Sequence, residues 1–165
     1  RLRGLAVAIV IISGGLVYGA IYPLGPAVER TLAAREAGGD KPKNWSDGIP
    51  WKKWSPEAVE QTVRAGKPVF VDFTAAYCTQ CKANKATATN TADVRARMEA
   101  LGVVPFVADF TNGDKTIFNE MKRFGRAGPP MNLIYKPGDP DSPLLLPTVL
   151  SKDLLLQKLD EVVAS

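Results

Sequence analysis

Residues 68–82 read PVFVDFTAAYCTQCK and contain both cysteines of the 165-residue chain, Cys78 and Cys81. The apolar run 69–73 before them predicts a central strand that is buried on both faces. The residues after Cys78 predict a helix, so the first sulfur would lie at a helix N-terminus, where free N–H groups and the helix dipole favour a thiolate. A thiolate beside a second thiol is the minimal arrangement for thiol–disulfide exchange.

Other interpretations of the cysteine pair are weaker. A structural disulfide would close a loop of two residues, which restricts the unfolded chain little and therefore stabilises little. A zinc site needs four ligands and an iron–sulfur cluster needs further thiolates, but the chain has no histidine and no third cysteine. We therefore predict a redox-active Cys78–Cys81 disulfide that works without another cofactor.

The run from Val69 to Lys82 resembles the active-site signature of the thioredoxin family. In that family an aromatic residue, usually Trp, precedes the first cysteine, and an acidic residue lies six positions before it. Tyr77 and Asp72 occupy these two places, so the aromatic residue differs from the usual one.

A second similarity to the same family lies downstream, in the segment RFGRAGPPM of residues 123–131. It is similar to the family's loop that ends in a cis-proline opposite the active site, and Pro130 fits that proline. Pro129 before it is less usual, but a Pro–Pro bond can still be cis because a tertiary amide has only a weak trans preference. A plain turn proline is the alternative.

From residue 54 onward the chain is more narrowly similar to the C-terminal periplasmic domain of the membrane thiol:disulfide interchange reductase DsbD and its relatives. Lys85 departs from that branch, because many relatives carry an acidic residue four positions after the second cysteine. If that residue moves protons, the role is unfilled here or falls to Asp72 alone. Besides the active-site run, the segments that carry the similarity are 55–59, 108–111 and 124–126.

The resemblance implies an α/β thioredoxin fold, with a central mixed sheet flanked by helices, over residues 54–165. Cys78 would attack a partner's disulfide and Cys81 would resolve the mixed disulfide. Asp72 would be a buried acid that takes the proton from Cys81, although an ordinary hydrogen-bonded carboxylate is the alternative. The residues expected to contact the substrate are Tyr77, Thr79, Gln80, Pro129 and Pro130.

Capping residues and apolar periodicity predict the element order β-α-β-α-β-β-α over the same domain, which matches a thioredoxin core. Ser55 is the expected N-cap of the first helix and Gly66 its C-terminal stop. The expected strands are 69–73, 103–110, 131–135 and 144–146, and the later helices begin at Thr79, near Thr91, before Ile117 and after Ser151.

Residues 5–24 carry no charged side chain, and residues 1–25 are expected to form a transmembrane helix. Twenty residues of helix span about 30 Å, the thickness of a bilayer's hydrocarbon core. Arg1 and Arg3 before the run predict a cytoplasmic N-terminus and a translocated C-terminal part. A cleaved signal peptide and a buried core helix are the alternatives.

Residues 26–53 read as a linker, since glycine, proline and charged residues at 38–43 are poor material for packing. Trp51 and Trp54 at its end are expected to pack on the domain edge. The formal charge of +4 is spread among 17 acidic residues, so no nucleic-acid partner is expected.

Membrane attachment and the resemblance together predict a bacterial inner-membrane protein whose catalytic domain lies in the periplasm. It would receive electrons from a membrane-embedded dithiol and pass them to periplasmic thiol proteins. No histidine lies between the cysteines to stabilise a thiolate, which also favours a reductant. The alternatives are a disulfide oxidase or isomerase, and a thiol-dependent chaperone or docking module for cytochrome or metalloprotein maturation.

Overall fold

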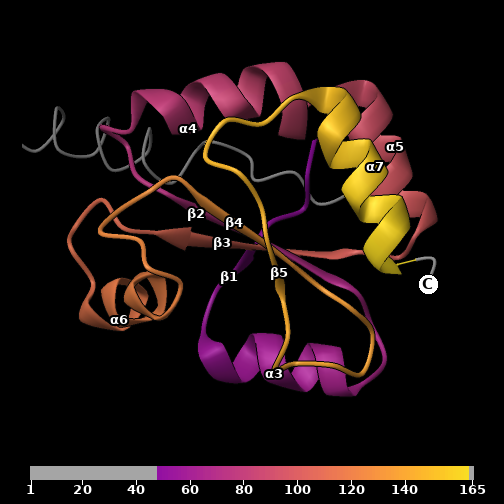
Figure 1. The fold of residues 1–165 in the computed structure, drawn as a ribbon, viewed down its shortest axis with the longest axis horizontal. Helices are drawn as coiled ribbons and strands as arrows, with labels where there is room; N and C mark the ends of the chain where they lie inside the picture. The colour runs from indigo at the N-terminus through magenta and orange to yellow at the C-terminus, as the bar shows by residue number, and fades with distance from the viewer. Residues whose placement is uncertain (1–47, 164–165) are drawn as a thin grey trace, which may run out of the picture. The chain divides into compact units, whose positions relative to one another are not determined.

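The computed structural model describes residues 48–163, which contain a five-stranded mixed sheet (Figure 1). The strand order is β1-β3-β2-β4-β5. Strands β1, β3 and β2 run parallel, β4 runs antiparallel to β2, and β5 runs antiparallel to β4. This confirms the predicted mixed sheet. The strands are β1 (Lys52–Lys53), β2 (Val69–Thr74), β3 (Val104–Asp109), β4 (Met131–Tyr135) and β5 (Leu144–Leu145).

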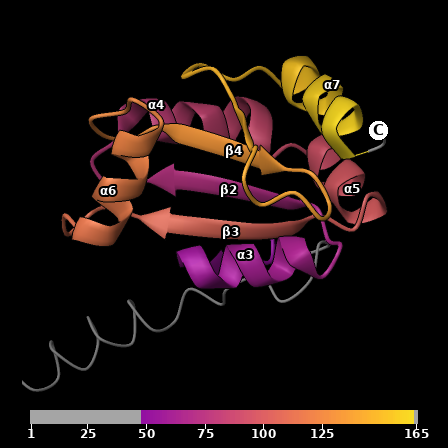
Figure 2. The same ribbon diagram turned by 60° about the horizontal axis from the view of Figure 1, so that its bottom comes forward.

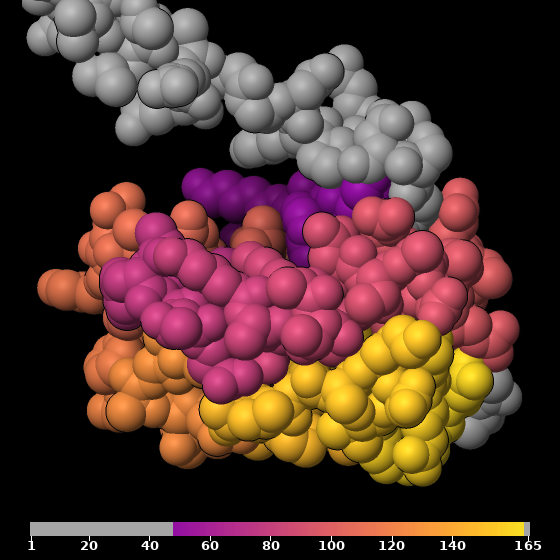
Figure 3. All heavy atoms as spheres, turned by 90° about the horizontal axis from the view of Figure 1, so that it is seen from above, coloured from indigo at the N-terminus to yellow at the C-terminus, as the bar shows by residue number. Residues whose placement is uncertain are grey.

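Helices cover both faces of this sheet (Figure 2). Helices α3 (Pro56–Arg64) and α6 (Lys115–Arg123) lie on one face. On the other face lie α4 (Thr79–Asn84), its continuation η1 (Lys85–Thr89), α5 (Ala92–Ala100) and α7 (Lys152–Val163). Figure 3 shows α4, η1, α5 and α7 side by side as one continuous surface.

Central strand β2 determines which side chains point to which helices, and all six of its residues are buried. Val69, Val71 and Phe73 belong to the apolar core beneath α3 and α6, whereas Phe70 belongs to the core beneath α5 and α7. Side chains alternate along a strand, so Asp72 points to the same face as Phe70. The predicted acid therefore lies in the layer that the cysteine-bearing helix covers.

The predicted ends of the first helix are confirmed. The N–H of Ala58 donates to the Ser55 hydroxyl at 3.1 Å, which makes Ser55 the N-cap of α3. Gly66 follows the helix with a φ of 76°, a conformation that glycine adopts without steric cost.

The helix that carries the cysteines begins at Thr79, as predicted, and extends beyond α4. It continues directly from α4 into the π-helical turn η1 and ends at Thr89. Thr91 then begins α5 as its N-cap residue, which confirms the predicted start near this residue. Because η1 continues α4 without a break, Lys85 lies one helical turn beyond Cys81.

Strand β1 lies within the stretch that was expected to be a linker. Trp54 N–H donates to the Val107 carbonyl at 3.0 Å, and Ile49 is buried. Trp51 packs on Phe70 with ring centroids 6.1 Å apart, so the domain begins earlier than residue 54. Two exposed lysines at a sheet edge give no apolar alternation, which is why sequence patterns did not reveal the strand.

The predicted transmembrane helix over residues 5–24 lies outside the described residues, as does most of the predicted linker. Among the helices of residues 48–163, none has both the length and the apolar character that crossing a bilayer requires.

Candidate active site

Cys78 and Cys81 form a disulfide where β2 leads into α4, with Cα atoms 5.3 Å apart. Cys78 is the N-cap of α4, and its sulfur accepts the Cys81 N–H at 3.1 Å. The Cys78 N–H in turn donates to the Ala75 carbonyl at 3.0 Å, which fixes the short link from the strand. The predicted strand–turn–helix arrangement is therefore present.

Both cysteines are buried, but to different degrees. Cys78 is 8% exposed and Cys81 is 1% exposed. Both pack with Ala75 and the half-buried Phe110. A partner's disulfide can therefore reach Cys78 more readily than Cys81, which is the order that the predicted roles require.

Asp72 is buried beneath this helix, with 4% of its surface exposed. Its Oδ1 accepts a hydrogen bond from Asn132 Nδ2 at 2.9 Å, and its Oδ2 lies 3.2 Å from Lys85 Nζ. Burial raises the pKa of Asp72 above its ordinary value, while the nearby ammonium of Lys85 and the amide of Asn132 act in the opposite direction. A raised pKa makes this carboxylate a better proton acceptor than an exposed one.

Lys85 connects the cysteine-bearing helix with β2. Its backbone N–H donates to the Cys81 carbonyl, so it stands one turn beyond that cysteine. Its Nζ donates to Thr74 Oγ1 at 3.2 Å and forms the ion pair with Asp72. Lys85 and Thr74 also line a cleft of about 580 Å³, together with Trp51, Lys53, Trp54, Val107, Ala108, Asp109, Asn112, Asp114 and Ile117.

The predicted cis-proline is confirmed, because the Pro129–Pro130 bond is cis. Pro130 is buried and leads directly into β4, whose first residue Met131 pairs with Phe73 near the end of β2. Pro129 and Pro130 therefore lie at the end of the sheet from which the chain continues to the disulfide.

The three other residues expected to contact a substrate surround the disulfide with unequal exposure. Tyr77 is 64% exposed and Thr79 is exposed. Gln80 is half-buried, and its amide donates to Asn84 Oδ1 at 2.9 Å. Tyr77 and Thr79 are therefore available to a partner. The side chain of Gln80 is instead engaged by Asn84, one turn further along the helix.

Sequence reasoning missed two asparagines that organise the site. Asn132 stands opposite Asp72 in the β2–β4 register. Asn84 is 4% exposed and bonds to residues 148 and 150. Each is a single amide side chain among residues that are otherwise buried. A buried polar side chain needs a hydrogen-bond partner, so an asparagine at such a position is a signal of a specific contact. That signal could have marked both positions.

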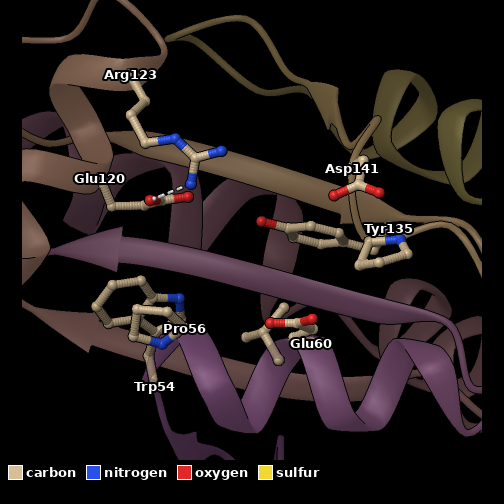
Figure 4. Close-up of a pocket in the computed structure, with 9 residues that line it drawn as sticks. Trp54, Pro56, Glu60, Glu120, Arg123, Tyr135 and Asp141 are labelled. Atoms are coloured by element: carbon tan, nitrogen blue, oxygen red, sulfur yellow. Dashed lines mark hydrogen bonds and ion pairs between the residues drawn. The ribbon is translucent and has the colours of Figure 1, made fainter.

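A separate pocket of about 260 Å³ lies on the α3–α6 face (Figure 4). Tyr135, which lines it, ends β4, whereas Pro130 precedes the first residue of that strand. Glu120 pairs with Arg123 at 2.8 Å, and the hydroxyl of Tyr135 points into the pocket. Burial and the Glu120 carboxylate raise the pKa of Tyr135 to about 12, so the phenol stays protonated. The pocket contains none of the predicted redox residues. Its lining is Trp54, Pro56, Val59, Glu60, Glu120, Arg123, Tyr135, Pro140 and Asp141.

Comparison with curated proteins identifies a relative of this chain. The thiol:disulfide interchange protein DsbD 1 of Pseudomonas aeruginosa is 29% identical over 118 residues. The match covers 72% of this chain and 19% of that protein, so the chain spans about a fifth of the length of this relative.

Solved structures show the same fold. The oxidised C-terminal domain of Neisseria meningitidis DsbD superposes with a TM-score of 0.53 at 21% identity, covering 64% of this chain and 90% of that one. Its reduced form gives 0.54 at 20% identity, covering 67% and 99%. A thioredoxin from Thermus thermophilus gives 0.54 at 18% identity, covering 68% and 86%.

The sequence family described as thioredoxin-like matches residues 50–137, more than half of the chain. Those residues include the disulfide, Asp72 and the cis-proline. A thioredoxin fold that presents a Cys-x-x-Cys disulfide at a helix N-terminus is that of a thiol:disulfide oxidoreductase. This chain belongs to the thioredoxin-like family.

Proposed function

We propose that the chain is a membrane-anchored periplasmic reductase, which relays electrons from a membrane-embedded dithiol to periplasmic thiol proteins. The observation that carries the proposal is the unequal burial of the two sulfurs above a buried carboxylate, with Cys78 at the N-terminus of α4 and Asp72 beneath the helix. The similarity to a thiol:disulfide interchange protein over 118 residues supports the choice of partners.

The reaction begins at the more accessible sulfur. The Cys78 thiolate attacks one sulfur of a partner's disulfide, a bond to that sulfur forms, and the partner's own S–S bond breaks. The displaced partner sulfur leaves as a thiolate and takes a proton from water. The product is a mixed disulfide through Cys78.

The second step releases the partner. Asp72 accepts the thiol proton of Cys81, and the Cys81 thiolate attacks Cys78. The mixed disulfide breaks and the second partner sulfur leaves and is protonated. In sum, two electrons and two protons pass to the partner, and Cys78 and Cys81 end as a disulfide. This disulfide is the redox centre itself. A membrane dithiol must reduce it again before the next cycle.

The anchoring part of the proposal rests on the apolar residues 5–24 and the two arginines before them. It is tested by labelling intact cells that express the full chain carrying Cys81→Ser with a thiol reagent that does not cross the inner membrane. A periplasmic domain is labelled at Cys78 without breaking the inner membrane, whereas a cytoplasmic domain is labelled only after lysis.

The direction of electron flow is tested by equilibrating the reduced chain against glutathione buffers at pH 7. A reductant should have a potential near that of thioredoxin, about −270 mV. A potential near about −120 mV, as found in strong oxidants, would instead support a disulfide oxidase.

A docking module for cytochrome or metalloprotein maturation is the alternative function. The disulfide, in which Cys78 is less buried than Cys81, favours the relay. In a relay, Cys81→Ser accumulates covalent mixed disulfides through Cys78, and replacement of both cysteines by serine abolishes partner capture. A docking module would retain the same partners without either sulfur.

A further inference from the structure

We infer that Lys85 is a positioning residue for the exchange reaction, because its ammonium holds Asp72 as a proton-accepting carboxylate and links it to the solvent cleft beside β2 and β3. Lys85 can have this role only if the chain exchanges disulfides, so the inference rests on the proposed function.

The position of Lys85 follows from the helix. Residues four apart on a helix share a face, and the Lys85 N–H bonds to the carbonyl of Cys81. The side chain therefore leaves the helix above the same sheet surface as Cys81. There its Nζ reaches Asp72 Oδ2 and Thr74 Oγ1, each at 3.2 Å.

The two ends of the ion pair differ in burial. The Asp72 side chain is 5% exposed and the Lys85 side chain is 36% exposed. Lys85 and Thr74 both line the cleft, so the ammonium lies between the buried carboxylate and solvent. A proton taken up by Asp72 can therefore return to water on the Lys85 side of the helix, away from a docked partner.

Other charged groups near the pair are placed differently. Lys53 from β1, Asp109 from the end of β3 and Asp114 before α6 line the same cleft. From β4, the neutral amide of Asn132 donates to the other carboxylate oxygen. Within residues 48–163, Lys85 is the cation that forms an ion pair with Asp72.

The charge of Lys85 matters most in the resolving step. Asp72 must be ionised to accept the Cys81 proton, and it must lose that proton before the next cycle. Burial alone favours the protonated acid, and a nearby positive charge opposes this. With a neutral residue at position 85, Asp72 would remain protonated to higher pH, and ring closure by Cys81 would require higher pH.

The test is the pH profile of ring closure in the full chain. The reduced chain is mixed with excess dithionitrobenzoate, which forms a mixed disulfide at Cys78 and releases one coloured thiolate. Attack by Cys81 then releases the second coloured thiolate in a phase whose rate does not depend on reagent concentration. Lys85→Met should slow this second phase about tenfold at neutral pH, which corresponds to a shift of about one pH unit in its midpoint.

Two matched variants separate the specific contact from general charge. Lys85→Arg keeps the cation and should restore closure to within about twofold of wild type. Lys82→Met removes an equal charge from the exposed face of the same helix and should leave the midpoint unchanged. A shift of equal size in Lys82→Met would overturn the role of the contact.

A double-mutant cycle shows whether Lys85 acts through Asp72. If it does, adding Lys85→Met to Asp72→Asn changes neither the rate nor its pH dependence. This background also removes the unpaired buried charge that Lys85→Met alone would leave. An additive effect, or coincident profiles for wild type and Lys85→Met, would refute the inference. Loss of ring closure in the wild-type chain would instead refute the proposed function.

Discussion

Asn84 Nδ2 lies 2.8 Å from the carbonyl oxygen of Thr148, a residue 64 positions further along the chain. Asn84 Oδ1 accepts the Leu150 N–H at 3.1 Å as well as the amide of Gln80. Arg126, from the loop before the cis-proline, donates to the Thr148 hydroxyl at 2.8 Å. These bonds join the cysteine-bearing helix, the cis-proline loop and residues 148–150 into one unit around the disulfide.

Replacement of Asn84 by alanine should therefore destabilise the domain. It leaves the buried Leu150 N–H and the Thr148 carbonyl without this partner, and each unsatisfied group costs about 1–3 kcal/mol. We expect a loss of about 2–4 kcal/mol in the free energy of unfolding, measured by urea denaturation. Gln80→Ala is the control: it removes one half-buried bond and should cost less than about 1 kcal/mol. Equal costs for the two variants would contradict this account of Asn84.

Asp72→Asn should stabilise the domain at neutral pH, because the folded chain buries a charge that the unfolded chain exposes to water. Since burial raises the folded pKa of Asp72, its contribution to stability is fully present below the unfolded value of 3.8 and is lost as pH rises through the folded pKa. The stability gained by the asparagine variant should therefore be absent near pH 3 and grow as the pH rises through the folded pKa of Asp72. Urea midpoints across this range test it, and a gain that does not vary with pH would exclude titration of Asp72 as its cause.

Tyr77 and Val149 are the large hydrophobic side chains that are exposed among residues 48–163, each at 64%. Tyr77 precedes Cys78, and Val149 lies between the two residues that Asn84 holds beside the helix. Both are available to a protein partner. We expect Tyr77→Ser and Val149→Ser to slow exchange with protein disulfides severalfold and to leave exchange with glutathione disulfide and the stability almost unchanged. An equal loss with both kinds of disulfide would indicate an effect on the sulfurs themselves.

Local sequence patterns predicted much of this fold. Cys78 at a helix N-terminus follows from a buried strand, a short link and helix-forming residues, all within fifteen positions. Pro130 came from the resemblance of its loop to a known family. The ends of α3 were predictable from the sequence because serine and glycine, here Ser55 and Gly66, have specific roles in helix capping.

Tertiary contacts were harder to foresee. The pairing of Lys85 with Asp72 depends on how the helix is rotated above β2, which residue spacing alone does not determine. Lys85 was visible in the sequence only as a departure from related domains. Strand β1 escaped prediction for another reason: its two lysines are exposed, and its stability comes from pairing with β3 and not from its own residues.

The central claim is that Cys78 is the reactive sulfur, and differential alkylation tests it most directly. The reduced full chain is treated with iodoacetamide at pH 7, and modification of each cysteine is followed over time by mass spectrometry. We predict that Cys78 is alkylated at least about tenfold faster than Cys81, because it is the more exposed sulfur and lies at the helix N-terminus. Equal rates, or a Cys78 thiol that resists alkylation at this pH, would contradict the account.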